Sequence, residues 1–330
     1  MGALKKHWLF PAMVATVALA LSLGSQGAWV REYHVITVGI FLAFFATGLA
    51  LDMSHLKLRD LQLKAALAAV VSSLALVPLL AWALAYWFLP LELTIGVCII
   101  ATAPVSIVSG TVMTAIARGN IPLSVFICLL GNIVGIFTIP FSLQLLVGVA
   151  ADIELPVFDM LLSLLATVLL PMALGVLTRP LLRSLLARHG AAFSVFQQCI
   201  VLLIMFNAFS GSGARLVAAG GVLPAVFLFI VALHSLVLAL NYGLRRLMRL
   251  DRASTSAFTI HTSQKTLTVS YVVWAGSFAA HYPLALIPGI VYHLTQMVVD
   301  TFVAERFKRS SPSSKEGPSL SAGRCLDSSP

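Results

Sequence analysis

Residues 65–89 read AALAAVVSSLALVPLLAWALAYWFL and contain no Asp, Glu, Lys or Arg. A helix needs roughly 20 apolar residues to cross the hydrocarbon core of a bilayer, and this run is long enough to do so. Its apolar residues do not alternate with polar ones, as they would in the short strands of a membrane barrel. The stretch therefore predicts a membrane-spanning helix, in which every backbone hydrogen bond is made internally.

Nine other runs have the same quality, so we expect ten crossings. The ten predicted spans lie near residues 8–23, 34–52, 62–89, 92–117, 121–148, 156–178, 193–210, 217–243, 254–280 and 283–304. Of the 330 residues, 59% are hydrophobic and only 10% are charged, and the mean hydropathy is +0.99. Soluble domains carry roughly 25% charged residues. These values exclude a soluble globular enzyme, a disordered chain and a small disulfide-stapled module, and they indicate a polytopic membrane protein.

Basic residues gather in alternate loops of this arrangement. With a cytoplasmic N-terminus, 18 of the 21 Lys and Arg residues fall in cytoplasmic segments, namely Lys5, Lys6, Lys57, Arg59, Lys64, Arg118, Arg179, Arg183, Arg188, Arg245, Arg246, Arg249, Arg252, Arg306, Lys308, Arg309, Lys315 and Arg324. Arg31 and Arg215 fall in outer loops, and Lys265 falls inside a span. Because basic flanks resist translocation, both termini are predicted to be cytoplasmic.

The same distribution indicates which partners the chain has. Its net charge of +9 suits an anionic inner leaflet of the lipid bilayer. No basic face combines with aromatic stacking positions outside the spans, so no nucleic acid partner is expected. No Asn-x-Ser/Thr glycosylation site occurs, which fits a bacterial inner (plasma) membrane. The four cysteines lack metal-ligand spacing, so neither a structural metal nor a disulfide is expected.

Ten spans divide into two groups of five. An odd number of spans per repeat makes the second repeat enter the membrane upside down. The predicted fold is thus an all-α membrane protein with ten transmembrane helices in two inverted repeats, residues 1–150 and 151–308. Residues 309–330, rich in Ser and Pro, are predicted to form a disordered cytoplasmic tail. The N-terminal span also resembles a signal peptide, but its cleavage would leave nine spans and no symmetry.

The fourth span of each half carries the most polar stretch at membrane depth. These stretches are Thr102–Thr111 and Thr259–Thr268. Pro104 removes a backbone donor and Gly110 adds local freedom, so span four is a candidate broken helix. Span nine has no Pro or Gly in its polar stretch, but its Ser, Thr and Gln offer the backbone alternative partners. The pair predicts a mid-membrane site; the alternative is a proline kink with a Ser/Thr helix interface.

Lys265 lies about twelve residues from either end of its predicted span, which is too deep to reach the interface easily. A charge at that depth costs several kcal/mol, so the lysine must be paired, solvated, neutral or used. One interpretation is direct coupling or substrate contact. The other is a built-in cation that satisfies the carbonyls at the helix break.

Other polar residues in the spans are weaker signals. His234 and Asn241 share a face of span eight, and we expect them to form hydrogen bonds between helices. The same expectation holds for Gln197, Gln198, Asn207, His293 and Gln296. Asp159 and Asp300 lie near the ends of spans six and ten, and we expect both at the membrane interface.

At these positions the sequence resembles the bile acid:sodium symporter family. The resemblance covers about residues 8–308 and is clearest in MTAIARGN (113–120) with Pro122-Leu123-Ser124, and in SQKTLT (263–268). With Ile287-Pro288 and Val291-Tyr292-His293, it is nearest to the branch of sodium/bile acid cotransporter seven and its bacterial relatives. It implies a panel domain (spans 1, 2, 6 and 7) and a core domain (spans 3–5 and 8–10). It also implies crossing, interrupted helices four and nine, and alternating access to an organic anion.

The family's sodium-binding positions carry over only in part. The resemblance puts them at Ser73, Gly110, Thr111, Ser124, Cys128, Ile260 and Gln264. Of these positions, Thr111, Ser124 and Gln264 are the candidates for a sodium site. The family's bridging Glu falls on Ile260, and a cation, Lys265, stands nearby. Because like charges repel strongly at low dielectric, our hypothesis is that Lys265 replaces a sodium ion.

The sequence thus predicts a secondary active transporter, a symporter of a small organic anion, with sodium or a proton as the coupling ion and no other cofactor. The alternative is a membrane regulator of ion homeostasis with little transport of its own. An enzyme is not expected, since the spans hold no GxSxG or HExxH motif and no paired Asp residues. The candidate binding residues are Ser106, Ser109, Thr111, Ser124, His261, Thr262, Ser263, Gln264, Lys265 and Thr266, with Pro104 and Gly110 as the structural break.

Overall fold

The computed structural model describes residues 8–24, 35–51, 62–151, 154–210 and 220–310. These residues are helices, turns and short connections, without a strand among them. Six helices in this part of the chain are long and apolar enough to cross a membrane, and three shorter helices are also apolar. The protein is therefore a multi-pass integral membrane protein. The predicted tail from residue 311 onward and the segment around residues 25–28 lie outside the described residues.

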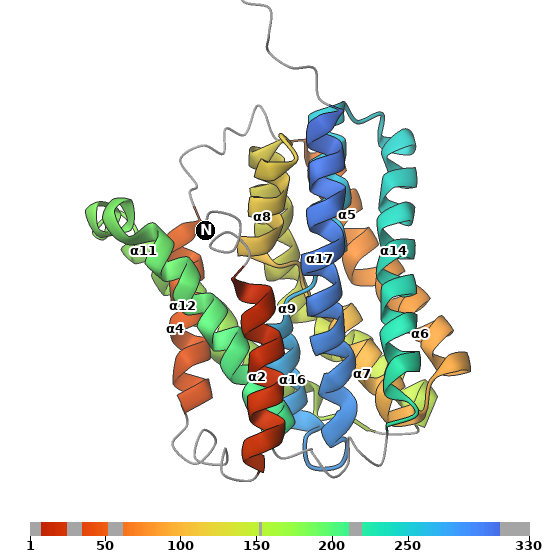
Figure 1. Cartoon of the computed structure of the whole chain (residues 1–330). Helices are drawn as coiled ribbons and strands as arrows, with labels where there is room; N and C mark the ends of the chain where they lie inside the picture. The colour runs from red at the N-terminus through yellow and green to blue at the C-terminus, as the bar shows by residue number, and fades with distance from the viewer. Residues whose placement is uncertain (1–7, 25–34, 52–61, 152–153, 211–219, 311–330) are drawn as a thin grey trace, which may run out of the picture.

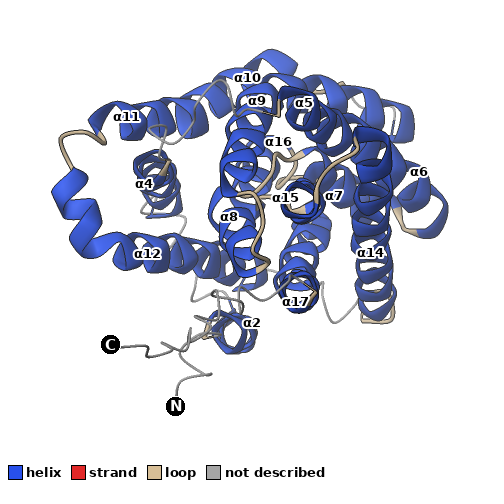
Figure 2. Ribbon diagram, turned by 90° about the horizontal axis from the view of Figure 1, so that it is seen from above, coloured by secondary structure: helices blue, strands red, loops and turns tan. Residues whose placement is uncertain are grey.

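One group of helices stands to the left in Figure 1 and can be followed again in Figure 2. It consists of α2 (Leu9–Leu23), α4 (Val35–Ala50), α11 (Leu170–Thr178) and α12 (Arg183–Ser210). Helix α4 packs on α11, and α12 packs on both α2 and α4. A Cβ atom at Gly48 would lie 2.1 Å from the Met172 carbonyl oxygen, and one at Gly175 would lie 2.2 Å from the Phe45 oxygen. Only glycine allows α4 and α11 to approach this closely.

The second group forms the thicker part of the molecule (Figure 2). Its members are α5 (Leu63–Val71), α6 (Val77–Phe88), α7 (Leu91–Thr102), α8 (Ile107–Ile116), α9 (Ile121–Ala151), α14 (Leu223–Met248), α15 (Arg252–Ser263), α16 (Leu267–Ser277), η6 (Pro283–Leu286) and α17 (Ile287–Arg309). Helix α10 (Val157–Leu164) continues into α11 through η5 (Leu165–Leu169) and contacts α9 and α16. Helices α5 and α6 are likewise joined by η4 (Ser72–Leu76).

The two π-helical turns, η4 and η5, each precede a proline, at Pro78 and Pro171. Proline has no backbone N–H and its ring crowds the carbonyl four residues earlier. A widened turn relieves that crowding within an otherwise continuous helix. In η4 the Val77 N–H bonds to the Ser72 oxygen. The Ser73 carbonyl is then left without a helical donor, because the next residue in that register is Pro78.

Two predicted spans differ from the helices at their ends. The span predicted at 193–210 is the last part of α12, which begins at Arg183 and kinks at His189 (φ −125°, ψ 15°). The span predicted at 217–243 begins at Leu223 and continues to Met248. Both helices extend into basic segments because backbone hydrogen bonding continues after the apolar run has ended.

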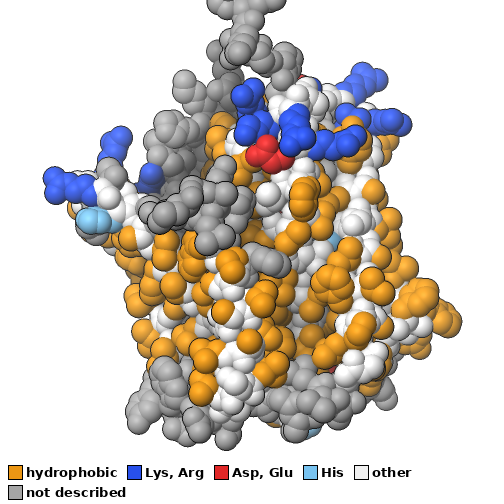
Figure 3. All heavy atoms as spheres, viewed as in Figure 1, with side chains coloured by type: hydrophobic (Ala, Val, Ile, Leu, Met, Phe, Trp, Pro, Cys, Tyr) orange, Lys and Arg blue, Asp and Glu red, His pale blue; other side chains and the backbone are white. Residues whose placement is uncertain are grey.

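Lys and Arg side chains gather at one end of the molecule, the upper end in Figure 3, while hydrophobic side chains cover the flank below them. The basic end includes the last turns of α14, with Arg245 and Arg246, and of α17, with Arg306, Lys308 and Arg309. This is the charge distribution that positive-inside topology predicts. Lys265 is the exception, since its side chain is fully buried.

Candidate functional site

Two helices are interrupted where they meet inside the second group. Helix α7 ends at Thr102 and α8 begins at Ile107, while α15 ends at Ser263 and α16 begins at Leu267. The connecting residues are extended, with ψ 147° at Ala103 and 145° at Gln264. The Thr266 N–H donates to the Pro104 carbonyl at 3.0 Å, so the two breaks are joined through their backbones.

The break at 264–266 is held by side chains of α17. Gln296 accepts from the Lys265 N–H at 2.8 Å and donates to the Lys265 carbonyl at 2.9 Å. The Tyr292 hydroxyl donates to the Ser263 carbonyl at 2.8 Å. These bonds replace the intrahelical ones that the extended backbone cannot make, so buried polar groups stay paired. A break without proline or glycine is stable here for that reason.

The Lys265 side chain points toward two backbone carbonyls that lie near Pro78 and Pro104. Its Nζ donates to the Ser73 carbonyl at 2.6 Å, to the Ser73 hydroxyl at 2.9 Å and to the Ala103 carbonyl at 3.0 Å. The turn before Pro78 frees the first carbonyl, and the break around Pro104 frees the second. An ammonium has three donors, and three oxygens surround this one. Three oxygen dipoles thus face the Lys265 Nζ, and it has no acidic partner among the described residues.

A polar chain runs from Gln264 to a buried acid. Gln264 accepts from the Ser109 hydroxyl at 2.6 Å and donates to Asp300 Oδ2 at 2.8 Å. The Ser109 hydroxyl also lies 2.7 Å from that of Ser106. Asp300 Oδ1 lies 2.8 Å from His234 Nε2, and neither side chain is exposed to solvent. The expectation of an interfacial Asp300 is therefore wrong: α17 continues well past this residue, and α14 and the break both pack over it.

The His261 ring lies beside Gly110 of α8. Its Nδ1 lies 2.5 Å from the Ser124 hydroxyl, which also donates to Thr114 Oγ1 at 3.2 Å. A Cβ atom at Gly110 would lie 2.8 Å from the His261 ring, so glycine is the residue that leaves room for the imidazole. A break at Gly110 is not what the structure shows, because α8 runs through it; the interruption lies at residues 103–106.

The remaining predicted site residues are spread around the two breaks. Thr111 is partly buried on α8, and the buried Thr262 hydroxyl has no hydrogen-bond partner in the part of the chain that the structure describes. Ser263 accepts from Asn241, which in turn accepts from Ser72. Ser124 and Gln264 have separate partners, and no described hydrogen bond joins Thr111, Ser124 or Gln264 to one another.

A cavity of about 940 Å³ lies between the two groups of helices, against the breaks. Its polar lining comprises Thr47, Ser106, Ser109, Asn132, Gln197, Gln198, Thr266, Thr268, His293 and Thr301. The rest of the described lining is apolar, and none of the described lining residues is Asp, Glu, Lys or Arg. The lining extends from the break toward the basic end, where it includes Ile116 and Phe302.

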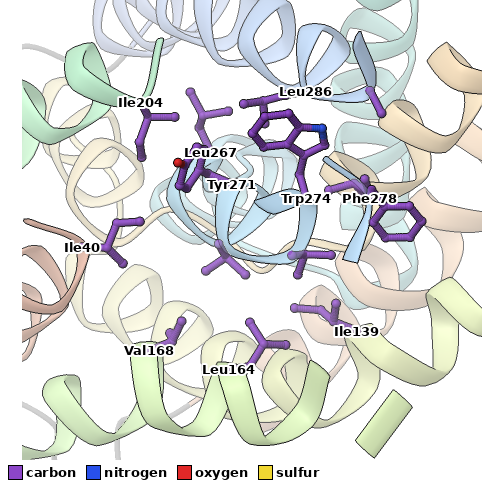
Figure 4. Packing of buried hydrophobic residues seen from close by; sticks show 14 of the residues in the cluster. Ile40, Ile139, Leu164, Val168, Ile204, Leu267, Tyr271, Trp274, Phe278 and Leu286 are labelled. Carbon is purple, nitrogen blue, oxygen red and sulfur yellow. The ribbon is translucent and has the colours of Figure 1, made fainter. Parts of the chain in front are cut away.

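Away from the basic end, hydrophobic side chains are packed around α16. Figure 4 shows Trp274 of α16 close to Leu286, with Tyr271 of the same helix, Phe278 directly after it, and Ile40 and Ile204 on the neighbouring helices. These residues are buried and belong to one cluster, together with Ile139, Leu164 and Val168. The two helix groups are thus in contact at this end and separated by the cavity at the other.

The fold defines a multi-pass membrane protein, and the comparisons with known proteins assign it to a class of transporters. The pattern of the SBF-like CPA transporter family matches residues 7–309, so the chain belongs to that family. This confirms the resemblance to bile acid:sodium symporters and places the chain among transporters rather than enzymes.

Three relatives illustrate its range. "Probable sodium/metabolite cotransporter BASS4, chloroplastic" of Oryza sativa subsp. indica is 27% identical over 325 residues, which cover 93% of this chain and 77% of the relative. "Sodium/bile acid cotransporter 7" of Rattus norvegicus is 24% identical over 335 residues, or 96% of both chains. "Uncharacterized sodium-dependent transporter YocS" of Bacillus subtilis (strain 168) is 23% identical over 310 residues, or 92% of both chains.

Sequence reasoning missed three contributors to this site. Asp300 was assigned to the interface, although its acidic charge inside a predicted span was itself a signal. Gln296 was expected to form an ordinary hydrogen bond between helices, yet it holds the second break open. Asn132, which donates to the Val105 carbonyl beside the first break at 3.1 Å, is an amide within an apolar span and could have been found in that way.

Proposed function

We propose that this protein is a secondary active transporter of a small organic anion and that it works by alternating access. In this proposal ten spans form two inverted repeats, residues 1–150 and 151–308. Spans 1, 2, 6 and 7 move as a panel against a core of spans 3–5 and 8–10. The observation that carries the proposal is the cavity between these two groups, at the meeting point of two interrupted helices, whose described lining residues carry no Asp, Glu, Lys or Arg.

The chemistry of the cavity suits an anion with an apolar body. Ser106 and Thr266 precede the first residues of α8 and α16, and neither side chain caps its helix. Both residues line the cavity, so two helix N-termini contribute unbonded N–H groups and positive dipole ends near it. Lys265 lies directly between Gln264 and Thr266 in the same break. A carboxylate would bind at this polar end, and its hydrocarbon part would contact the apolar lining.

The cavity reaches toward the basic end, and the packed cluster around α16 closes the opposite end. If positive-inside topology holds, both termini are cytoplasmic and this conformation is open toward the cytoplasm. Transport to the other side requires the panel to separate from α16, which would expose part of the cluster that includes Tyr271 and Trp274.

Sodium coupling is replaced, in this proposal, by the lysine ammonium. The resemblance puts sodium-binding positions at Ser73, Gly110 and Ser124. In this chain Lys265 bonds to Ser73, and the His261 ring contacts Gly110 and Ser124. Protein nitrogen atoms therefore contact the groups that a metal ion would need. A fixed charge would stabilise the crossing in every step of the cycle without a bound cation.

Thermal unfolding of the purified protein in sodium chloride and in choline chloride, at equal ionic strength, tests the role of Lys265. A ligand that binds only the folded state raises its stability. We expect equal transition temperatures for the native protein. Lys265→Ala should lose roughly 3 kcal/mol, because two buried carbonyls lose their donor, and sodium should then restore part of that loss.

Lys64→Met is the matched control, since Lys64 is exposed on α5 and makes no part of the site. It should change neither stability nor ion response. Sodium-specific stabilisation of the native protein would contradict the replacement of sodium by Lys265. Transport itself is tested with proteoliposomes and labelled taurocholate or lactate. Failure of every anion in a monocarboxylate and bile-acid panel to bind or accumulate would contradict the proposed transport.

A further inference from the structure

His234 and Asp300 form the one ion pair that the structure describes entirely inside the protein. The imidazole Nε2 and the carboxylate Oδ1 are 2.8 Å apart, and both side chains are fully buried. The other carboxylate oxygen accepts from Gln264. Among the described residues, His234 Nδ1 has no hydrogen-bond partner. The pair joins α14 to α17 behind the second break.

Few other titratable groups surround this pair. Tyr292 of α17 lies edge-on to the His234 ring, with the ring centres 5.1 Å apart, and its hydroxyl is bonded to Ser263. Along the break and α15, the neighbours are Lys265, bonded to Ser73 and Ala103, and His261, bonded to Ser124. His293 of α17 bonds to Gln296. Of the helices that pack on α17 here, α8 carries no titratable side chain, and α7 carries two: Cys98 in the hydrophobic cluster with Trp274, and Glu92, which caps Leu284 at the far end.

The protonation states of the pair differ in net charge. With one shared proton the pair is neutral, either as imidazolium and carboxylate or as imidazole and carboxylic acid. Loss of one proton as H⁺ leaves neutral imidazole, which still donates from Nε2 to Asp300, and a net charge of −1. In both neutral forms the additional proton resides on Nδ1. The two states therefore differ by one unit of charge inside the protein, where a net charge is costly.

The pair is also connected to the cavity. Asp300 holds Gln264, Gln264 holds Ser109, and Ser109 lines the cavity beside Ser106. Gln264 is the first residue of the break, and Thr266 at its end is bonded to Pro104. A change in charge at Asp300 therefore alters its hydrogen bond to Gln264. Gln264 in turn contacts Ser109 of α8, which lines the cavity.

We propose that His234 and Asp300 form the proton-binding pair through which this transporter couples anion movement to a proton. The proton is exchanged at His234 Nδ1. Gln264 transmits the charge of the pair to the break. This inference rests on the proposed transport function for its coupling step, although the proton site itself can be tested without any substrate.

The test measures the transition temperature of the full-length protein in detergent from pH 5.5 to 9. As the pH rises toward the value at which the folded pair releases its proton, the native protein should lose about 3 °C per pH unit, because the unfolded chain has already lost that proton, and the transition temperature should level off above that pH. Asp300→Asn keeps the side-chain shape but cannot carry the charge, so this step should vanish. His234→Gln should remove it as well, and it serves as the second variant if Asp300→Asn does not fold.

Asp159→Asn is the matched control, because Asp159 is exposed on α10, away from the cavity beside the breaks. It should keep the pH step, and so should Lys265→Met. The inference would be overturned if the pH-dependent change in transition temperature persisted in both Asp300→Asn and His234→Gln. It would also be overturned if that change disappeared in Lys265→Met alone. A substrate-independent step in a protein that moves no anion would uphold the proton site and refute the transport function instead.

Once an anion that accumulates in proteoliposomes is known, the coupling can be measured directly. An inward pH gradient should drive accumulation by the native protein, and Asp300→Asn should retain anion binding but lose gradient-driven accumulation by at least tenfold. If the pair were only a structural cross-link between α14 and α17, Asp300→Asn would not lose accumulation while keeping anion binding. Equal accumulation by the variant would show that the proton is carried elsewhere.

Discussion

The two breaks reach a similar extended backbone by different routes. At 103–106 the local sequence is sufficient, because Pro104 lacks an N–H and disfavours helix at the residue before it. At 264–266 no residue prevents a helix, and the break depends on Gln296 and on Lys265 itself. The first break is thus favoured by its own sequence and is also held by bonds from Thr266 and Asn132, whereas the second exists only after α17 and η4 have packed against it.

Hydrogen bonds also join the two breaks to each other. Lys265 of the second break bonds to Ala103 of the first, and Thr266 bonds to Pro104. The first break therefore provides two carbonyl acceptors that hold the second, and a change at the second break would alter these bonds. Such an asymmetry suits a pair in which one half-helix junction responds to protonation and the other is a fixed support.

Gln296→Met should have the largest effect on this comparison. It removes both bonds to the Lys265 backbone and leaves a buried N–H and C=O unpaired, at a cost of at least about 3 kcal/mol in the free energy of unfolding. Denaturation in detergent measures the loss. Gln198→Met is the control, since the Gln198 side-chain oxygen has no partner among the described residues, and its cost should stay within about 0.5 kcal/mol. Equal costs for both would mean that Gln296 does not hold the break.

Gly110→Ala should have an intermediate effect. The new methyl group would approach the His261 ring, which lies one turn before the second break and is fixed to Ser124. Forcing the ring aside should cost about 2 kcal/mol despite the better helix propensity of alanine. Gly243→Ala on α14 meets nothing within 4 Å and should be neutral or up to about 1 kcal/mol stabilising. Thermal unfolding of both variants compares them, and a neutral Gly110→Ala would refute the close packing.

Pro104→Ala should have the smallest effect, although proline is the residue that the sequence singles out. The bonds from Thr266 to residue 104 and from Asn132 to Val105 remain available, so the extended segment should persist. The expected cost is about 1 kcal/mol, from lost rigidity and lost ring packing on Gly135. A loss of stability as large as that expected for Gln296→Met would show that Pro104, rather than the tertiary hydrogen bonds, maintains the first break.

Local sequence rules accounted for much of the architecture. Long apolar runs predicted membrane helices, since a spanning segment must satisfy its own backbone and contact lipid. Pro104 predicted the first break because the missing N–H is a property of one residue. Lys265 was recognised as unusual because its charge lies far from either end of an apolar span. The quoted motifs also indicated the transporter family, which the match over residues 7–309 confirms.

The partners in the site were decided only by tertiary structure. Lys265 bonds to Ser73 across 192 positions of the chain, and Asp300 meets His234 across 66. No local pattern shows that Pro78 frees the carbonyl that Lys265 needs, or that Asp300 is buried rather than interfacial. Composition and spacing determine which segments enter the membrane, because that depends on each segment alone. Which buried polar group satisfies which other depends on how the helices pack, and this pairing sets the chemistry of the site.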